Sequence, residues 1–294
     1  MPDWLDGNAL LALVAAGFWG VGDFSGGMAV KTAAGGANPL GAALRVVILS
    51  HMTSFSVLLF AALALGDSFP HGRLLAWGLA AGVAGGTSLS AFYIALSRGA
   101  MGASAAISGV LAATIPAVVS MLADGSPGWR RGIGFLVAGA AIWMIAAGDA
   151  AHEDTSTTWL AIGAGTGFGI YFVALKYAGA GGVVWPMATA RMGSISACAL
   201  ILLGLRGTGV VASPVRISRR VVRWVLSTAL FDTSGNLIFI AATRAGRLDV
   251  AAVLASLYPA STILLAAWVM KERPTRRQGW GMVTAVAAVV LIAG

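Results

Sequence analysis

Long apolar runs separated by short polar stretches form the dominant pattern of this chain. Runs such as "GVLAATIPAVVSMLA" (109–123) and "GMVTAVAAVVLIAG" (281–294) recur from end to end. An uninterrupted run of about 18 or more apolar residues is typical of a membrane-spanning helix. The pattern therefore predicts an all-α membrane protein that crosses the bilayer several times.

Turn residues and charges divide the chain into ten expected transmembrane helices. Each is long enough to cross a hydrocarbon core of about 30 Å. The connections are short, the longest being residues 206–220, so we expect no soluble domain. The expected spans are 8–29, 39–65, 73–97, 102–123, 130–148, 158–178, 184–205, 221–243, 249–270 and 276–293.

The composition strengthens the membrane prediction. Of the 294 residues, 58% are hydrophobic and 10% are charged, whereas a soluble domain has about 25% charged residues. The net charge of +8 comes from short basic clusters between the expected spans, such as 216–223 and 271–277. Clusters of this kind contact phospholipid and set topology. We therefore expect membrane lipid as a partner and no nucleic acid.

Three simple features narrow the classes of protein further. Cys198 is the only cysteine, which excludes an intrachain disulfide and a cysteine metal cage. The sequence contains no nucleotide-binding loop, and we expect neither a metal nor a cofactor. The head "MPDWLDG" (1–7) is acidic, and no small-residue cleavage site follows the first apolar run. We therefore interpret that run as a retained span.

The two halves of the chain resemble each other at a shift of 146 residues. "IALSRG" (94–99) then aligns with "IAATRA" (240–245), and Arg45 aligns with Arg191, without a gap. Internal similarity at a fixed spacing indicates a repeated architecture.

Each expected repeat contains five helices, the first in residues 8–148 and the second in residues 158–293. Because five is odd, the second repeat must enter the membrane in the opposite orientation to the first. Inverted repeats are found in many secondary transporters, whose substrate site lies at the repeat interface near the bilayer midplane.

Three stretches give the chain a resemblance to a known family. They are "FWGVGDFSGGMAVK" (18–31), "ALSRG" (95–99) and "SLYPASTILLAAWVMKERPTRRQGWG" (256–281). The last resembles the closing pattern of the EamA branch of the drug/metabolite transporter superfamily: a proline-broken ninth helix, a turn with a glutamate, and a glycine-rich tenth helix. The first repeat departs from this pattern, because "ADGSPGWRRG" (123–132) lacks the glutamate.

The resemblance implies a secondary transporter in the bacterial cytoplasmic membrane, with both termini in the cytoplasm. Members of that family export amino acids, drugs or other metabolites, or carry nucleotide sugars, so the family does not fix the substrate. We expect a monomer driven by an ion gradient or by the gradient of its substrate. The distribution of arginine and lysine between the two sets of loops favours the opposite topology by the positive-inside rule.

Asp232 is the first candidate for a functional side chain. It lies near the centre of the expected span 221–243, where a charge costs at least about 2.5–3.5 kcal/mol on insertion scales. Asn236 is one helical turn away on the same face and favours a wet environment. We interpret Asp232 as lining a transport pathway. The alternative is that it locks helices together through a hydrogen bond or an arginine pair.

Other polar residues lie inside the expected spans. His51 is central in the second span, where hydrogen bonding to another helix and a functional role are equally good interpretations. Asp23 lies in the glycine-rich first span. Arg45 and Arg191 lie about two turns inside their spans, where their side chains can reach the headgroups. We favour a structural role for both arginines, with pairing to Asp23 or Asp232 as the alternative.

Four deep aromatic residues suit a pocket for a zwitterion with an apolar side chain: Trp19, Tyr93, Tyr171 and Tyr258. The alternative for each ring is helix packing. Glycines spaced by four, as in 78–86 and 163–167, predict close helix crossings.

An enzyme alternative arises from "GVGD" (20–23), which has the G-x-G-D letters of intramembrane aspartyl proteases. In those proteases the other aspartate precedes this motif, and a proline-alanine-leucine motif follows it. Here Asp232 comes after the motif and the second motif is absent. We therefore expect no enzyme activity.

The sequence thus predicts an amino-acid exporter of the EamA type that works by alternating access. A multidrug or cation exporter of the same fold is the alternative. The candidate substrate-binding residues are Trp19, Asp23, His51, Tyr93, Tyr171, Asp232, Asn236 and Tyr258, and the candidate hinges are Pro116 and Pro259.

Overall fold

The structure is a computed structural model that describes residues 7–35, 39–98, 101–146, 155–209, 211, 217–270 and 275–293. These residues fold into helices and form no strand, which confirms the all-α prediction for this part of the chain. The helices are α1 (Gly7–Ala34), α2 (Pro39–Leu65), α3 (Arg73–Ser97), α4 (Met101–Asp124), α5 (Trp129–Ala146), α6 (Thr155–Ala178), η1 (Gly179–Gly181), α7 (Val184–Gly204), η2 (Arg206–Thr208), α8 (Arg219–Ala245), α9 (Leu248–Ala255), α10 (Tyr258–Met270) and α11 (Arg276–Ala293).

The expected spans lie close to the observed helices. α2 and α3 have the expected bounds, and α1 continues to Ala34, past the expected end at residue 29. The ninth expected span, 249–270, is divided between α9 and α10. The apolar runs and the turn residues were therefore sufficient to place the helices along the chain.

Seven of the described helices are long and apolar enough to cross a membrane. α5 and α11 are not among the seven, and α9 and α10 are each too short. The structure therefore supports a multi-pass membrane protein, and the number of ten spans stays a prediction. The seven are Gly7–Ala34, Pro39–Leu65, Arg73–Ser97, Ile107–Asp124, Thr155–Gly181, Val184–Thr208 and Arg219–Ala245.

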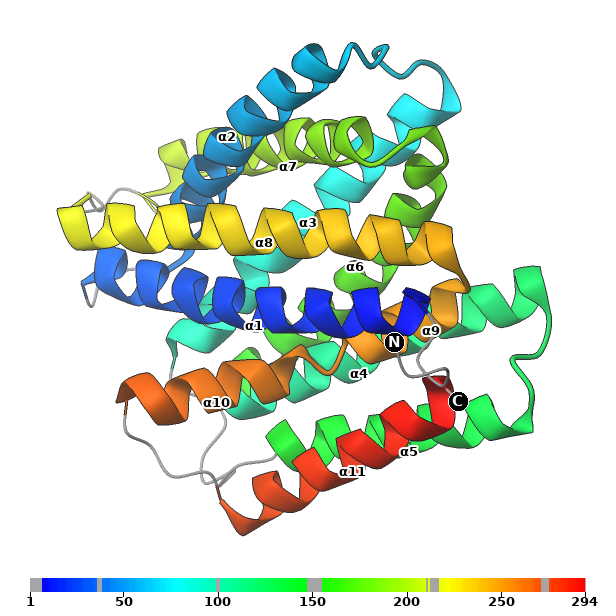
Figure 1. The fold of residues 1–294 in the computed structure, drawn as a ribbon. Coiled ribbons are helices and arrows are strands. Elements are labelled where there is room, and N and C mark those ends of the chain that lie inside the picture. Colours follow the sequence, from blue (N-terminus) through cyan, green and yellow to red (C-terminus); the bar gives the residue numbers. More distant parts are fainter. Residues whose placement is uncertain are drawn as a thin grey trace.

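Helices from the two expected repeats pack against each other and do not form separate bundles (Figure 1). α1 packs along α8, while α3 packs along both α6 and α7. α5 and α11 lie together at one edge of the molecule. The 146-residue shift relates α1 to α6 and α3 to α8, so the α1–α8 and α3–α6 contacts are reciprocal. Reciprocal contacts are expected of two related halves. The inverted orientation of the halves stays a prediction.

Glycine allows the close approach of α3 to α7. A Cβ added at Gly82 would overlap the backbone carbonyl of Ala190, so the prediction of a close crossing is confirmed there. The same prediction is wrong at Gly163, because a Cβ there would meet nothing within 4 Å. Cys198 of α7 is fully buried in the α3–α7 interface, with its Sγ 3.6 Å from Ser90 Oγ.

Pro259 accounts for the break between α9 and α10. Proline has no backbone N–H to donate to the carbonyl of Ala255 four residues earlier, and its ring crowds that carbonyl. At the break, the amide of Leu257 donates to the carbonyl of Leu254 at 3.2 Å, a bond one residue shorter than in an α-helix. α4, in contrast, continues through Pro116. The hinge role of both prolines stays a prediction.

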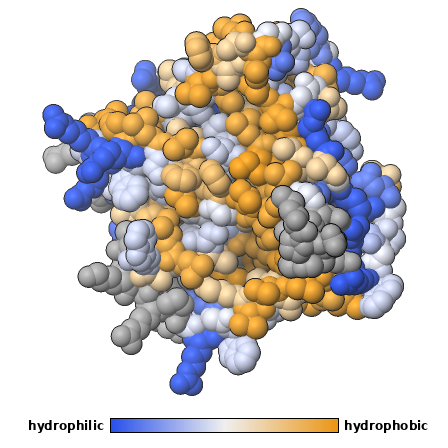
Figure 2. Space-filling view, in the orientation of Figure 1, coloured by the Kyte–Doolittle hydropathy of each residue, from blue (hydrophilic) through white to orange (hydrophobic). Residues whose placement is uncertain are grey.

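The outer surface suits a lipid environment. Apolar residues cover much of the middle of the visible face, while hydrophilic residues gather toward its margins, where helices end (Figure 2). Large apolar side chains among the described residues are widely exposed, Leu122 at 83% and Trp268 at 80%. α1 begins and α11 ends on the same side of the molecule (Figure 1).

Candidate functional site

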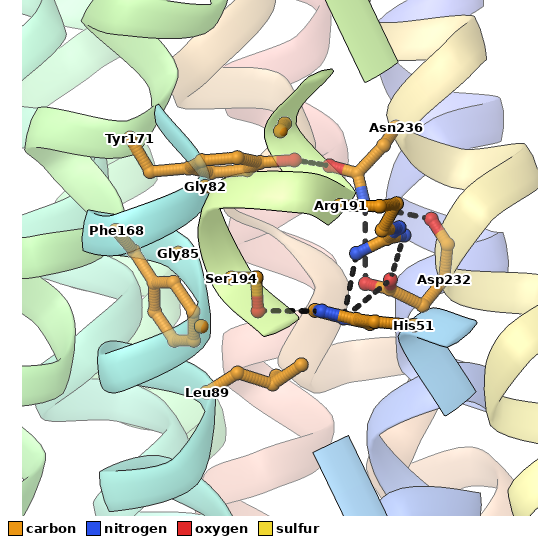
Figure 3. Close-up of a pocket in the computed structure, with 12 residues that line it drawn as sticks. His51, Gly82, Gly85, Leu89, Phe168, Tyr171, Arg191, Ser194, Asp232 and Asn236 are labelled. Carbon is orange, nitrogen blue, oxygen red and sulfur yellow. Dashed lines mark hydrogen bonds and ion pairs between the residues drawn. The ribbon is translucent and has the colours of Figure 1, made fainter. Parts of the chain in front are cut away.

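The centre of α8 holds Asp232 and Asn236 together. Asn236 Nδ2 donates to the backbone carbonyl of Asp232 at 2.7 Å and to its Oδ1 at 3.1 Å. From α6, Tyr171 Oη donates to Asn236 Oδ1 at 2.7 Å (Figure 3). Because Asn236 follows Asp232 by four residues, its amide binds the Asp232 carboxylate on one side and the Tyr171 hydroxyl on the other.

Arg191 of α7 provides the counter-charge of Asp232. Its Nη2 donates to Asp232 Oδ2 at 2.5 Å (Figure 3). The same Nη2 donates to Thr233 Oγ1 at 3.0 Å. Both charged residues are buried, Arg191 at 3% and Asp232 at 8% exposure. Arg191 therefore turns inward instead of reaching toward the headgroups, and the sequence-based alternative, a pairing with Asp232, is present. A carboxylate inside an apolar bundle attracts the guanidinium inward, because each charge alone would be costly there.

His51 of α2 extends this network. Its Nε2 lies 2.6 Å from Arg191 Nη1, and its Nδ1 lies 2.6 Å from Ser194 Oγ (Figure 3). A guanidinium can only donate hydrogen bonds, so Nε2 must accept and Nδ1 must carry the proton. His51 is therefore neutral in this arrangement and joins α2 to α7. The network links α2, α6, α7 and α8 at the centre of the bundle.

The four candidate rings have different surroundings. Trp19 of α1 stacks on Phe172 of α6, with ring centroids 5.1 Å apart. Tyr258 Oη lies 3.0 Å from Ser108 Oγ of α4. Tyr93 is fully buried.

Tyr93 packs directly against α1. A Cβ added at Gly26 would overlap the Tyr93 ring and hydroxyl, and this hydroxyl has no hydrogen-bond partner among the described residues. Tyr93 is also not among the residues that line the central cavities described next.

Two small adjoining cavities lie at this centre, with volumes of about 30 Å³ and about 40 Å³. Each has room for a few waters, since one water needs about 10–15 Å³, and both are far below the 300–1,000 Å³ typical of substrate pockets. The first is lined in part by His51, Arg191 and Ser194, the second by Trp19, Asp23, Phe172 and Tyr258, and both by Leu89, Phe168, Tyr171, Asp232 and Asn236.

Asp23 differs from Asp232 in its contacts. Asp23 is 8% exposed and lines the second cavity, and no described residue donates a hydrogen bond to it or pairs with its charge. The two acids are not hydrogen-bonded to each other, because Asp232 is bound to Arg191 and Asn236. They therefore do not form the proton-sharing pair that an aspartyl protease requires.

Arg45, which aligns with Arg191 in the internal repeat, has a different environment. It donates to the backbone carbonyls of Gly41 at 3.2 Å and of Val211 at 3.4 Å, contacts that agree with a structural role. Arg191 and Ser194 are the site residues that sequence reasoning missed. The depth of Arg191 in its span was the available signal, but depth alone did not show which way the side chain turns.

The second half of the chain is similar to a known family. Residues 155–294 match the model of the EamA-like transporter family. The match extends over α6 to α11 and includes Arg191, Asp232 and Asn236. The resemblance of residues 8–148 to that family stays a prediction.

A solved crystal structure has a similar fold, with a TM-score of 0.71 and 16% sequence identity, over 97% of this chain and 95% of that chain. At this identity the likeness shows the fold alone. A search of the curated proteins gives no match.

Proposed function

We propose that the protein is a secondary transporter that exports small metabolites, amino acids first among them, by alternating access across the bacterial cytoplasmic membrane. One observation carries this proposal: a buried network of charged and polar side chains joins helices of both expected repeats beside two small cavities. Ionisable groups inside a membrane bundle are costly, and they usually mark a substrate or ion pathway.

The chemistry of the centre favours an amino acid. A zwitterion presents an ammonium and a carboxylate together, and the centre contains two acids and one arginine. The stacked rings of Trp19 and Phe172 offer an apolar surface for a side chain.

The small cavities fit a contracted state in an alternating-access cycle, since a whole amino acid requires a larger space than either provides. Polar contacts join the two expected repeats at one end of the bundle. Lys176 Nζ lies 3.3 Å from Asp124 Oδ2, and Arg247 Nη2 donates to the carbonyl of Gly125 at 2.8 Å. Contacts of this kind would have to break for the cavities to open to that end.

A cation exporter is the second candidate. Asp23 has no partner among the described residues and lies next to aromatic rings, which favours a positively charged ligand without requiring a carboxylate. The two candidates differ in whether the ligand must also carry a negative group.

Uptake into liposomes containing the purified protein tests both. The screen uses labelled amino acids, nucleosides and cationic drugs, with and without a pH gradient, and protein-free liposomes as the control. We expect saturable flux of one or more amino acids. Flux of lipophilic cations alone would replace the amino-acid proposal with the second candidate, and absence of any flux would contradict both.

A further inference from the structure

The two central carboxylates have different contacts. Asp232 receives hydrogen bonds from Arg191 and Asn236, so its charge and its acceptor oxygens are occupied by the protein. Asp23, on α1, receives none from any described residue, although it is as buried as Asp232. Buried polar groups almost always have a partner. Since the described residues offer Asp23 none, the cavity that it lines is the place where a ligand can supply one.

The wall of that cavity is suited to a cation. Trp19 precedes Asp23 by four residues, which places the indole and the carboxylate on the same face of α1. The indole is stacked on Phe172, and Tyr258 lies in the same wall. Aromatic faces attract cations through the ring quadrupole, and a carboxylate attracts them through its charge.

A second unpartnered polar atom lies close by. Gly26 follows Asp23 by three residues on α1, and the Tyr93 hydroxyl packs against it without a hydrogen-bond partner. The hydroxyl belongs to α3 and does not line the cavity, so it adds a second oxygen without a partner among the described residues beside this face of α1.

The cavity volume limits the kind of cation. About 40 Å³ has room for a few waters. An –NH₃⁺ group is similar in size to a water molecule, whereas a quaternary ammonium carries four carbon substituents around its nitrogen. In this contracted state the space beside Asp23 therefore has room for an –NH₃⁺ group and not for a quaternary ammonium.

We propose that Asp23 binds the primary ammonium group of the transported substrate, and that Asp232 is a positioning residue held by Arg191. This assignment rests on the proposed transport function and specifies its ligand chemistry. It makes the substrate a primary amine, which favours amino acids over quaternary ammonium drugs.

The test measures binding of the twenty common amino acids to the purified full chain by calorimetry. The tightest ligand is then compared with three analogues: its decarboxylated amine, its deaminated acid and its N-trimethyl derivative. Each is measured on the unaltered chain, on Asp23→Asn and on Asp232→Asn, with the melting temperature of each preparation as a check on folding.

We expect Asp23→Asn to weaken the binding of the amino acid and of its decarboxylated amine by about 10- to 100-fold. This is the factor for a hydrogen bond between charged groups. The affinity for the deaminated acid should change by less than about threefold, because this ligand lacks the group that Asp23 binds. Asp232→Asn should change the affinity for ligands with the ammonium group and for ligands without it by the same factor. The N-trimethyl derivative should bind the unaltered chain at least about tenfold more weakly, and this comparison requires no variant.

Other outcomes distinguish a failure of the Asp23 assignment from a failure of the proposed amino-acid transport. An ammonium-specific loss at Asp232 instead of Asp23, or equal binding of the N-trimethyl derivative, would overturn the assignment while leaving amino-acid transport intact. Unchanged affinity in Asp23→Asn together with loss of flux driven by a pH gradient would make Asp23 a proton carrier and would also overturn it. Binding of none of the twenty amino acids would contradict the proposed amino-acid substrate itself.

Discussion

At the scale of single residues, the Arg191–Asp232 pair should respond most strongly to substitution. Asp232→Asn keeps the size of the side chain but leaves the Arg191 guanidinium buried without a counter-charge. Removing one partner of a buried ion pair costs about 3–5 kcal/mol, so we expect a marked fall in melting temperature. Arg191→Gln should have a similar effect. The melting temperature of the double variant should fall by less than the sum of the two single falls. Tryptophan fluorescence during heating in detergent measures each melting temperature.

Thr233→Val is the matched control for this comparison of single and double variants. It removes the 3.0 Å hydrogen bond from Arg191 and keeps the ion pair, so its melting temperature should stay near that of the unaltered chain. Strictly additive losses in the double variant would mean that the two charges do not stabilise each other.

The sequence identified several residues of this centre because a polar side chain is conspicuous in an apolar span. Asp232, Asn236, His51 and Tyr171 were found in this way, and the structure brings them together. Arg191 was equally conspicuous. Its side chain, however, is long enough to reach either the headgroups or the interior, and only the position of α8 relative to α7 determines which.

At the scale of helices, the crossing of α3 and α7 depends on the absence of a side chain at Gly82. Gly82→Ala would push a Cβ against the Ala190 carbonyl, and overpacking of this kind costs about 1–3 kcal/mol. We expect a lower melting temperature and a lower yield of folded protein. Gly163→Ala is the control, because a Cβ there meets open space and alanine favours a helix by about 1 kcal/mol over glycine. Equal melting temperatures for the two variants would contradict this account of the crossing.

Helix positions were predictable, but helix partners were not. The apolar runs and the turn residues placed the helices, and Pro259 predicted the interruption between α9 and α10. Pro116 was a candidate hinge on the same grounds, but α4 continues through it. Partner helices could not be inferred because helix faces in a membrane protein are apolar toward both lipid and protein. Neither hydrophobic pattern nor glycine spacing therefore distinguishes Gly82, at a crossing, from Gly163, which has open space beside it.

At the scale of the whole molecule, α1 begins and α11 ends on one side of the bundle. Reporter proteins fused to the two ends should therefore report the same compartment. We expect this compartment to be the cytoplasm, as the family resemblance implies. Activity of a periplasm-specific reporter at both ends would reverse the orientation in favour of the positive-inside rule. Different compartments at the two ends would contradict the arrangement of the helices.

Because Cys198 is buried, the rate at which its thiol is labelled reports how often the α3–α7 interface opens. Its thiol lies between α3 and α7, out of reach of a maleimide while the two helices are in contact. If reclosing is fast, the labelling rate equals the intrinsic reactivity of an exposed thiol multiplied by the fraction of time the interface is open. Because the chain has no other cysteine, mass spectrometry of a single adduct gives that fraction without any engineered site. A labelling rate that changes when substrate is added would show that α3 and α7 separate during the transport cycle.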